Sequence, residues 1–297
     1  MPASQRPDAV SPVALSGAAR VAGILGWPIA HSLSPRLHGF WLSRYRIDGA
    51  YVPMAVRPGT LGRALSGLTA LGFVGANVTI PHKEEACALV DEVAGLARRI
   101  GAVNTIVVRP DGRLFGTNTD AFGFIANLEV GCPGWRADAG PAVLLGAGGA
   151  ARAIAVTLLD AGTLALVIVN RDQRRAERLA AELGAVAVVG VQPWAKRADP
   201  LAGAALLVNA TSLGMAGKPQ LDLDLSALPA EAVVTDIVYV PLVTSLLASA
   251  AARGNRTVDG LGMLLHQARP AFQAWFGVDP EVTAELRRHV EQGLARP

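Results

Sequence analysis

Lys83 and Asp120 are the two side chains of this 297-residue chain that are best suited to acid–base chemistry. Lys83 ends the polar run Asn77–Lys83, which follows an apolar strand pattern. A lysine ammonium beside a carboxylate can pass a proton to a developing alkoxide. Asp120 ends the run Gly116–Asp120 and fits two roles, the partner of Lys83 or the N-cap of a helix beginning near Ala121. A solvated surface lysine is the alternative for Lys83.

Ser32 and Ser34 form a second polar pair, which follows the apolar run at 21–25. In extended backbone, hydroxyls two residues apart point to the same side and can bind a ligand carboxylate or hydroxyl. Pro35 fits the first position of a helix, so Ser34 is equally suited to capping that helix. The pattern alone leaves both interpretations open.

The run Gly146-Ala147-Gly148-Gly149-Ala150-Ala151 directly follows the buried strand pattern at 142–145. A glycine-rich turn between a strand and a helix lets backbone N–H groups approach a pyrophosphate, and the helix N-terminus favours negative charge. Gly146, Gly148 and Ala151 occupy the three small positions of a loose dinucleotide-binding fingerprint. The sequence therefore predicts a dinucleotide cofactor.

The run Asn170-Arg171-Asp172-Gln173-Arg174-Arg175 lies about 20 residues beyond this turn, where NAD enzymes place an acid and NADP enzymes often place arginine. Guanidinium groups stack on adenine and pair with a 2′-phosphate. The carboxylate of Asp172 instead repels a phosphate or accepts a bond from a ribose hydroxyl. NADP is therefore predicted with NAD left open, and a solvated helix start is the alternative for the arginines.

Apolar runs alternating with helical stretches must position these groups. In the first half, strands are expected at 21–25, 50–56, 73–78, 103–108 and 113–116, and helices at 34–43 and 61–71. The turn at Pro110–Gly112 predicts a hairpin between the last two of these strands. The alternation favours a mostly parallel sheet with helices on its faces.

The second half predicts a Rossmann-like doubly wound sheet. Strands are expected at 143–145, 164–169, 185–189, 205–208 and 233–237, and helices at 150–160, 173–183 and 241–253. The last helices, expected at 261–275 and 280–294, belong to neither sheet by order and are expected to return to the first domain. The predicted α/β organisation is a flexible extension (1–18), a substrate domain (19–120 and 259–297) and a dinucleotide domain (121–258).

Composition excludes several classes of protein. Half of the residues are hydrophobic and 17% are charged, which indicates a folded globular chain. Its apolar runs are shorter than the roughly 18 residues that span a bilayer, and it shows no secretion signal, so a cytoplasmic protein without a membrane partner is expected. The net charge of +3 is spread thinly, which disfavours nucleic acid.

A metal site is not expected. Cys87 and Cys132 show no metal or redox spacing, and the histidines show no ligand spacing. His266 lies on an apolar helix face, where a packed histidine is more common than a catalytic one.

Taken together, these motifs resemble the shikimate dehydrogenase family. The resemblance covers about residues 20–280 in consistent order. It rests on Gly26–His38, Asn77–Lys83, Gly101–Thr105, Gly116–Asp120, Gly146–Ala151 with Asn170-Arg171, Asn209–Met215 and Gly260–Ala268. The family reduces 3-dehydroshikimate to shikimate, a step of chorismate and aromatic amino-acid biosynthesis.

The resemblance implies roles for particular residues. Lys83 would be the acid/base, and Asp120 would orient the substrate hydroxyl and tune Lys83. The implied substrate ligands are Ser32, Ser34 and Tyr239 at the carboxylate, and Thr79, Asn104 and Gln267 at the ring hydroxyls. The implied cofactor residues are Gly146, Ala147, Gly148, Gly149, Ala150, Asn170, Arg171, Asp172, Arg175, Thr211, Ile237, Gly260 and Met263.

Two departures from the family pattern keep alternatives open. Asp172 stands where NADP-specific members usually carry Thr or Ser, and Gly39 stands where many carry Asn. A quinate/shikimate or amino-sugar-acid dehydrogenase that uses NAD at least partly is therefore the alternative, although Ser34 favours shikimate. A non-catalytic dinucleotide-binding protein is disfavoured because Lys83 and Asp120 are both present. The sequence leaves monomer and homodimer open.

Overall fold

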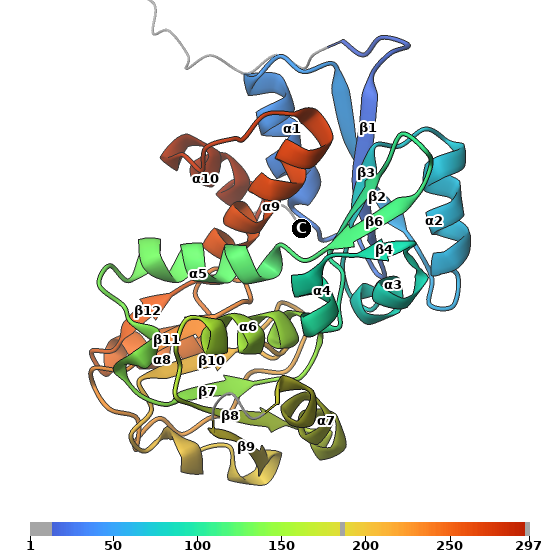
Figure 1. The fold of residues 1–297 in the computed structure, drawn as a ribbon. Helices are drawn as coiled ribbons and strands as arrows, with labels where there is room; N and C mark the ends of the chain where they lie inside the picture. Colours follow the sequence, from blue (N-terminus) through green and yellow to red (C-terminus); the bar gives the residue numbers. More distant parts are fainter. Residues whose placement is uncertain (1–13, 185–187, 295–297) are drawn as a thin grey trace, which may run out of the picture.

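The computed structural model describes residues 14–184 and 188–294, which form two sheets of six strands each. The sheets lie in separate parts of the molecule, with helices on their faces and between them (Figure 1). The predicted mixed α/β class is confirmed.

The first sheet has the order β2-β1-β3-β5-β6-β4. Its strands are β1 (Arg20–Gly26), β2 (Gly49–Ala55), β3 (Gly75–Val78), β4 (Glu92–Val93), β5 (Thr105–Val108) and β6 (Leu114–Thr117). Strand β5 is antiparallel to both β3 and β6, whereas the other neighbours pair in parallel. The predicted β5–β6 hairpin is confirmed. Because β5 is antiparallel to both β3 and β6, the carboxyl ends of β3 and β6, near Asn77 and Asn118, lie at the same end of the sheet.

The second sheet is parallel throughout and has the order β12-β11-β10-β7-β8-β9. Its strands are β7 (Ala142–Leu145), β8 (Ala165–Asn170), β9 (Val188–Pro193), β10 (Leu206–Asn209), β11 (Val233–Asp236) and β12 (Arg256–Val258). The strand order reverses between β7 and β10. In open α/β sheets, ligands bind outside the carboxyl ends of the strands at such a reversal.

Ten α-helices surround the sheets within the described residues. They are α1 (Ser34–Arg44), α2 (Leu61–Ala70), α3 (Lys83–Leu89), α4 (Gly95–Ile100), α5 (Asp120–Gly131), α6 (Gly149–Asp160), α7 (Gln173–Leu183), α8 (Ser245–Ala252), α9 (Gly260–Phe276) and α10 (Ala284–Glu291). Three 3-10 turns lie at Ala137–Ala139, Trp194–Lys196 and Asp199–Leu201. None of these helices is both long and apolar enough to cross a bilayer.

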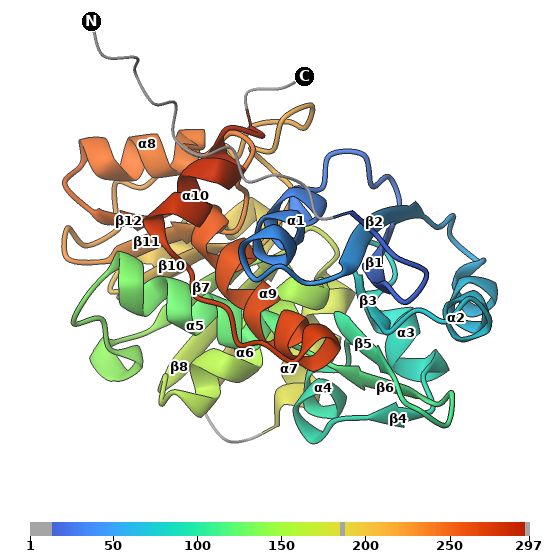
Figure 2. The same cartoon turned by 90° about the horizontal axis from the view of Figure 1, so that it is seen from above.

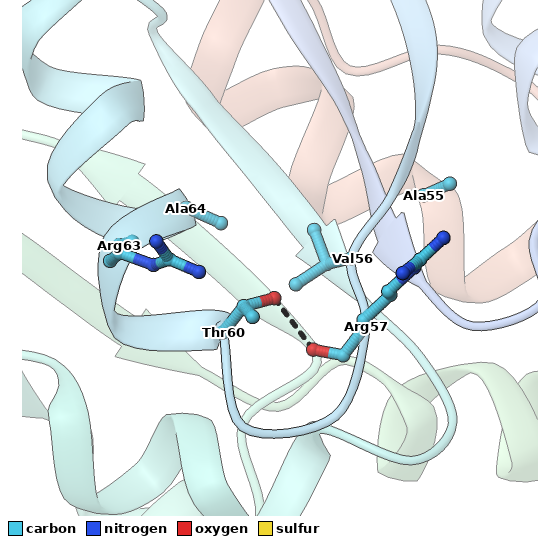
Figure 3. Close-up of a pocket in the computed structure, with 6 residues that line it drawn as sticks. All are labelled: Ala55, Val56, Arg57, Thr60, Arg63 and Ala64. Atoms are coloured by element: carbon cyan, nitrogen blue, oxygen red, sulfur yellow. Dashed lines mark hydrogen bonds between the residues drawn. The ribbon is translucent and has the colours of Figure 1, made fainter.

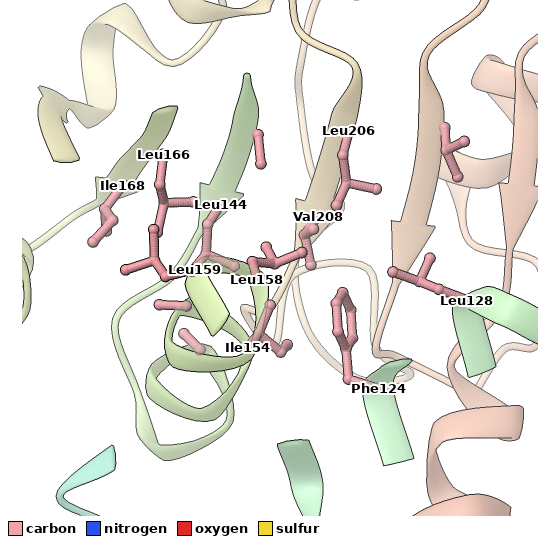
Figure 4. Close-up of a cluster of buried hydrophobic side chains, with 14 of the residues drawn as sticks. Phe124, Leu128, Leu144, Ile154, Leu158, Leu159, Leu166, Ile168, Leu206 and Val208 are labelled. Atoms are coloured by element: carbon pink, nitrogen blue, oxygen red, sulfur yellow. The ribbon is translucent and has the colours of Figure 1, made fainter. Parts of the chain in front are cut away.

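One buried cluster joins α5 and α6 to the second sheet (Figure 4). Phe124 and Leu128 of α5 meet apolar side chains of β7, β8 and β10 across Ile154 of α6. Met263 of α9 belongs to the same cluster. Helices α5 and α9 therefore pack against each other and tie the two parts of the molecule together.

The C-terminal helices return to the first part of the chain, as predicted. Leu286 of α10 and Phe272 of α9 share a buried cluster with Leu37 and Trp41 of α1. Figure 2 shows α9 and α10 alongside α1. The long sequence separation is bridged because α9 buries apolar side chains such as Phe272 in this shared cluster.

Several local predictions are wrong. Ser34 is the first residue of α1, the N-cap position is Leu33, and no side chain caps this helix. The expected extended backbone between Ser32 and Ser34 is absent, since Leu33 has helical angles (φ −88°, ψ −3°). The Ser32 hydroxyl instead accepts a 3.3 Å hydrogen bond from the Ser34 N–H.

Two expected helices begin later than predicted because threonines cap them. The Thr244 hydroxyl accepts from the Leu247 N–H, and the Thr283 hydroxyl accepts from the Leu286 N–H. Such caps set the first turn. The expected strand at 185–189 lies partly outside the described residues, and β9 continues to Pro193. The sequence patterns did not predict α3, α4, β4 or β12.

Part of the expected N-terminal extension, residues 1–13, lies outside the described residues. Within the described part, Ser16 is anchored to Asp48. Its N–H and its hydroxyl donate to the two carboxylate oxygens of Asp48, at 3.1 and 2.5 Å.

Candidate functional site

Lys83 and Asp120 form an ion pair with 2.6 Å between Nζ and Oδ2. Their side chains are 14% and 6% exposed, so the pair is largely shielded from water and still reachable by a ligand. Asp120 is the first residue of α5 and its side chain does not cap the helix, so the capping interpretation is wrong. The solvated-surface alternative for Lys83 is wrong as well.

Asn104 holds the other carboxylate oxygen of Asp120. Its Nδ2 donates to Oδ1 over 2.8 Å, and its own Oδ1 accepts the Thr119 N–H over 2.8 Å. The Asp120 N–H donates to Asn118 Oδ1 at 3.0 Å. Asn104 thus holds the carboxylate of Asp120, and Asn118 holds its backbone N–H. The orientation of the carboxylate toward Lys83 is therefore set before any ligand binds.

A chain of hydrogen bonds runs from Asn104 to Ser34. The Tyr51 hydroxyl donates to Asn77 Oδ1 at 2.6 Å, and Asn77 Nδ2 donates to the Thr105 hydroxyl at 3.0 Å. Thr105 in turn donates to Asn104 Oδ1 at 3.0 Å, and Ser34 hydrogen-bonds to the Tyr51 phenol. Burial raises the pKa of Tyr51, so this phenol stays a neutral donor.

Sequence reasoning missed Tyr51, Thr105 and Asn118 as members of this network. The signal that could have found such residues is the position of buried polar side chains along the strands. Asn77 lies near the carboxyl end of β3, and Asn118 directly follows β6. Both are buried, and buried amide side chains need hydrogen-bond partners.

Of the other implied substrate residues, Gln267 joins this network. Gln267 is 8% exposed, and its Oε1 accepts from Thr119 at 3.3 Å and Asn104 at 3.4 Å. Thr79 is half-buried directly after β3, and Ser32 is half-buried before α1. Tyr239, from the loop after β11, packs against the cluster under the first sheet, and burial raises its pKa to about 12.

The glycine-rich turn after β7 has the geometry of a phosphate cradle. Gly146 has φ +117°, and a Cβ there would lie 2.9 Å from the Ala210 carbonyl oxygen. A Cβ at Gly148 would meet nothing within 4 Å, so its backbone is open to a ligand. Ala151 is fully buried against the sheet. These are the three positions that a pyrophosphate site requires to be small, and the residues present fit a dinucleotide.

The same turn touches the acid–base pair. A Cβ on Gly149 would lie 3.1 Å from Lys83 Cβ and 3.2 Å from its Cδ. The stem of Lys83 therefore lies against the start of α6 while its ammonium points to Asp120. Ala147 is buried in the turn, and Ala150 is half-buried in the first turn of α6.

A second network, which sequence reasoning missed, shapes the loops after β10 and β11. Asn209 Nδ2 donates to Asp236 Oδ1 at 3.0 Å, and its Oδ1 accepts from the Thr211 hydroxyl at 2.7 Å. The Thr244 hydroxyl donates to Asp236 Oδ2 at 2.8 Å. Burial raises the pKa of Asp236. These bonds place Thr211 beside the Gly146 turn.

Ile237, Gly260 and Met263 meet near the start of α9. A Cβ on Gly260 would lie 2.5 Å from the carbonyl carbon and oxygen of Ile237, so only glycine fits there. Met263 is 7% exposed and packs into the cluster under the second sheet with Ile237 at its margin.

Asp172 is the N-cap of α7, where its Oδ1 accepts the Arg175 N–H at 3.2 Å. Asn170 Nδ2 donates to the Asp172 carbonyl at 2.8 Å, and Arg171 is exposed to solvent. The guanidinium of Arg175 forms an ion pair with Glu84 of α3. Thr, Ser and Asp all serve as N-caps, so this carboxylate replaces a hydroxyl without loss of the helix start.

The buried histidines carry no metal geometry. His38 is fully buried and stacked on Tyr51 with 4.0 Å between ring centroids, and burial lowers its pKa to about 3. His266 is half-buried with a lowered pKa, also mainly from burial. Among the described residues, no group of three or more His, Cys, Asp or Glu side chains is placed to hold a metal ion.

A separate hollow of about 470 Å³ lies beside the end of β2 and the start of α2 (Figure 3). Arg57 and Arg63 are its charged side chains, and the Thr60 hydroxyl donates to the Arg57 carbonyl at 2.7 Å. The Arg57 guanidinium lies 5.4 Å from the ring centroid of Trp27. Its lining carries no acid–base pair, in contrast to the ion pair of Lys83 and Asp120.

Known families match most of the chain. Residues 24–106 match the shikimate dehydrogenase substrate binding domain, residues 136–214 the shikimate / quinate 5-dehydrogenase family, and residues 260–284 the shikimate 5′-dehydrogenase C-terminal domain. The shikimate dehydrogenases (NADP(+)) of Rhodospirillum rubrum and Paramagnetospirillum magneticum are 62% and 60% identical to it. Each alignment covers 93% of this chain, and 98% and 99% of the relatives.

The comparison with solved structures points to the same family. A shikimate dehydrogenase in complex with NADP+ has a TM-score of 0.87 at 34% identity and covers 96% of this chain and 99% of its own. The shikimate 5-dehydrogenase of Thermus thermophilus with NADP(H) and shikimate scores 0.80 at 38% identity, covering 93% and 98%. Corynebacterium glutamicum quinate dehydrogenase with NAD scores 0.83 at 33%, covering 91% and 98%. This chain belongs to the shikimate dehydrogenase family.

Proposed function

We propose that this chain catalyses the reversible NADPH-dependent reduction of 3-dehydroshikimate to shikimate. The observation that carries the proposal is the Lys83–Asp120 ion pair lying against the glycine-rich turn at Gly149. A proton donor and the expected cofactor site are thereby adjacent, as reduction of a ketone requires.

Two sets of side chains are proposed to bind the substrate. Ser32, Ser34 and Tyr239 hold its carboxylate. Their hydroxyl groups suit that role because each can donate a hydrogen bond to a carboxylate oxygen. Thr79, Asn104 and Gln267 bind the ring hydroxyls. Asn104 then contacts both the substrate and Asp120, so substrate position and carboxylate position are linked.

Lys83 is the proposed acid–base group. Its Nζ donates a proton to the carbonyl oxygen as that oxygen becomes an alkoxide, and it takes the proton back in the reverse direction. Asp120 keeps the ammonium aimed at this oxygen and hydrogen-bonds to the substrate hydroxyl. The nicotinamide cofactor supplies the hydride when bound.

The cofactor is proposed to lie along the carboxyl ends of β7, β8 and β10. The N–H groups of Gly146–Ala150 face its pyrophosphate, and Thr211, Ile237, Gly260 and Met263 line the nicotinamide end. Arg171 and Arg175 are proposed to hold the 2′-phosphate beside Asn170 and Asp172. The relatives that are 60% and 62% identical are named as NADP(+) enzymes, which supports this choice.

We propose the domain division expected from the sequence, with a substrate domain formed by 19–120 and 259–297 and a cofactor domain formed by 121–258. A cytoplasmic location stays a prediction, and monomer and homodimer stay alternatives. Cell fractionation and analytical ultracentrifugation would test them.

Oxidation of quinate with NAD is the second candidate. Asp172 favours it, and the likeness to a quinate dehydrogenase in complex with NAD supports it. The test is a grid of initial rates with shikimate or quinate and with NADP+ or NAD+. The proposal expects the highest kcat/KM for shikimate with NADP+. Comparable or higher values with quinate or NAD+ would favour the second candidate instead.

Asp172→Thr is the matched variant for this grid. Threonine keeps the helix cap, removes the charge and adds a hydroxyl donor, so a gain in NADP+ over NAD+ use is expected from lost repulsion and from a hydrogen bond to the phosphate. Asp172→Ala, which removes both, separates loss of the cap from loss of the charge.

A further inference from the structure

The ion pair between Glu84 and Arg175 joins the first turn of α3 to the first turn of α7. These helices belong to different sheets, so a carboxylate from the proposed substrate domain reaches the proposed 2′-phosphate site. The argument that follows rests on the proposed role of Arg175 in binding that phosphate.

The position of Glu84 follows from its neighbour. The stem of Lys83 lies against Gly149, which fixes the start of α3 beside the glycine-rich turn. Glu84 is the next residue and projects from this anchored point. The side chains of Glu84 and Arg175 are 44% and 40% exposed, so a ligand in solution can reach both.

The nearby charges are not equivalent. Arg171 has no hydrogen bond or ion pair to the described residues, so a phosphate can take its guanidinium directly. The Asp172 carboxylate accepts a hydrogen bond from the backbone N–H of Arg175 and not from its guanidinium. Glu84 is therefore the carboxylate, within the described chain, that already occupies a guanidinium proposed for the phosphate.

We propose that Glu84 is a specificity-determining residue for the cofactor, because its carboxylate competes with the 2′-phosphate of NADP for Arg175. A phosphate monoester carries a charge of about −1.5 to −2 near neutral pH. It must displace Glu84 from Arg175 before it can pair with that guanidinium. NAD has a hydroxyl at this position and does not need this displacement.

The experiment measures dissociation constants for NADP+ and NAD+ with the full-length protein by isothermal titration calorimetry. Glu84→Gln should lower the dissociation constant for NADP+ about 2- to 5-fold, the range expected from freeing one exposed ion-pair partner. The dissociation constant for NAD+ should stay unchanged. Glu85→Gln is the matched control. It removes the same charge one residue later, where the carboxylate lies 3.5 Å from His82 Nδ1 instead of at Arg175. It should change neither constant.

Arg175→Gln separates this inference from the proposed function. If Arg175→Gln leaves NADP+ affinity unchanged, the phosphate role of Arg175 is wrong. If Arg175→Gln weakens NADP+ binding while Glu84→Gln leaves it unchanged or also weakens it, the proposed competition by Glu84 is excluded. If both single variants behave as expected, adding Glu84→Gln to Arg175→Gln should give no further change, and an undiminished gain there would also overturn the inference.

Discussion

Lys83 is a residue whose two ends serve different partners. Its ammonium lies 2.6 Å from Asp120, and its methylene stem lies against Gly149 of the glycine-rich turn. A long aliphatic stem with a charged tip can pack and titrate at the same time. Removing the side chain is therefore expected to affect both proton transfer and the contact between the two parts of the molecule.

Lys83→Ala should lower kcat about 10²- to 10⁴-fold, the contribution typical of a positioned acid–base group. Cofactor binding should survive because the turn itself supplies the phosphate contacts. Steady-state rates and a cofactor titration on the same preparation check both statements. Normal turnover by this variant would mean that another group moves the proton.

His38 should make the protein sensitive to acid. The pKa of this buried imidazole is about 3, below its ordinary value of 6.5, because burial penalises the charged ring. The unfolded chain therefore binds more protons than the folded one between these values. Stability falls as pH drops from about 6.5 toward 3. The neighbouring rings, Tyr51, Trp41, Phe272 and Trp275, offer it no compensating carboxylate.

His38→Phe should remove this share of the pH dependence. Between pH 7.5 and 5.0 the wild-type protein should lose about 2 kcal/mol more unfolding free energy than the variant, at about 1.4 kcal/mol per pH unit below the unfolded pKa. Urea unfolding of both proteins at the two pH values gives the difference. Equal losses would show that His38 does not titrate on unfolding.

Among the elements, the turn from β7 into α6 imposes different demands on two of its glycines. Gly146→Ala should destabilise the protein by about 1–3 kcal/mol, because it forces a side chain into positive φ against the Ala210 carbonyl. Gly148→Ala should leave the melting temperature nearly unchanged, because its Cβ would meet open space. It should nevertheless weaken cofactor binding, since a phosphate must approach that backbone.

Thermal melts without cofactor and a cofactor titration of both variants test this contrast. A Gly148→Ala protein that binds cofactor as the wild type does would exclude a close phosphate approach at this turn. A Gly146→Ala protein with an unchanged melting temperature would mean that the loop after β10 moves to accommodate the methyl group.

The elements also show where sequence patterns succeed. Strands with continuous buried apolar residues, such as β1 and β7, were predicted within one or two residues because burial on both faces leaves a clear signal. Helix α7 was predicted at its observed bounds, since Asp172 caps it and Gly184 follows it. Short elements such as α3 and β12 were missed, since seven or three residues are too few for a period to emerge.

At the scale of the whole molecule, a packed contact between α4 and α6 joins the two parts. Arg99 forms a bidentate ion pair with Asp160 at 2.8 and 3.0 Å, and Arg152 Nε donates to the Ile100 carbonyl at 2.6 Å. Ile100 also packs on Val156. The chain crosses between the sheets near Asp120 and again at 258–260, so movement is expected there while the α4–α6 contact persists.

Binding of shikimate together with NADPH, a pair that cannot react, should draw the two parts of the molecule closer together. Hydride transfer requires that water be excluded from the reacting atoms, and closure provides this. Small-angle scattering should show a smaller radius of gyration than for the protein alone. Matching profiles with and without both ligands would count against closure, and the protein with NADPH alone is the control.

The sequence by itself determined the fold class, the glycine-rich turn and the arginine-rich run, and it predicted Lys83 and Asp120 as the acid–base pair, because each rests on a local pattern or a residue type. Only the tertiary structure decided how they combine. It brought Lys83 within 2.6 Å of Asp120, linked Ser34 to Asn104 through Tyr51, and set Glu84 on Arg175. Contacts between distant segments depend on how helices and sheets pack, and no spacing along the chain encodes that directly.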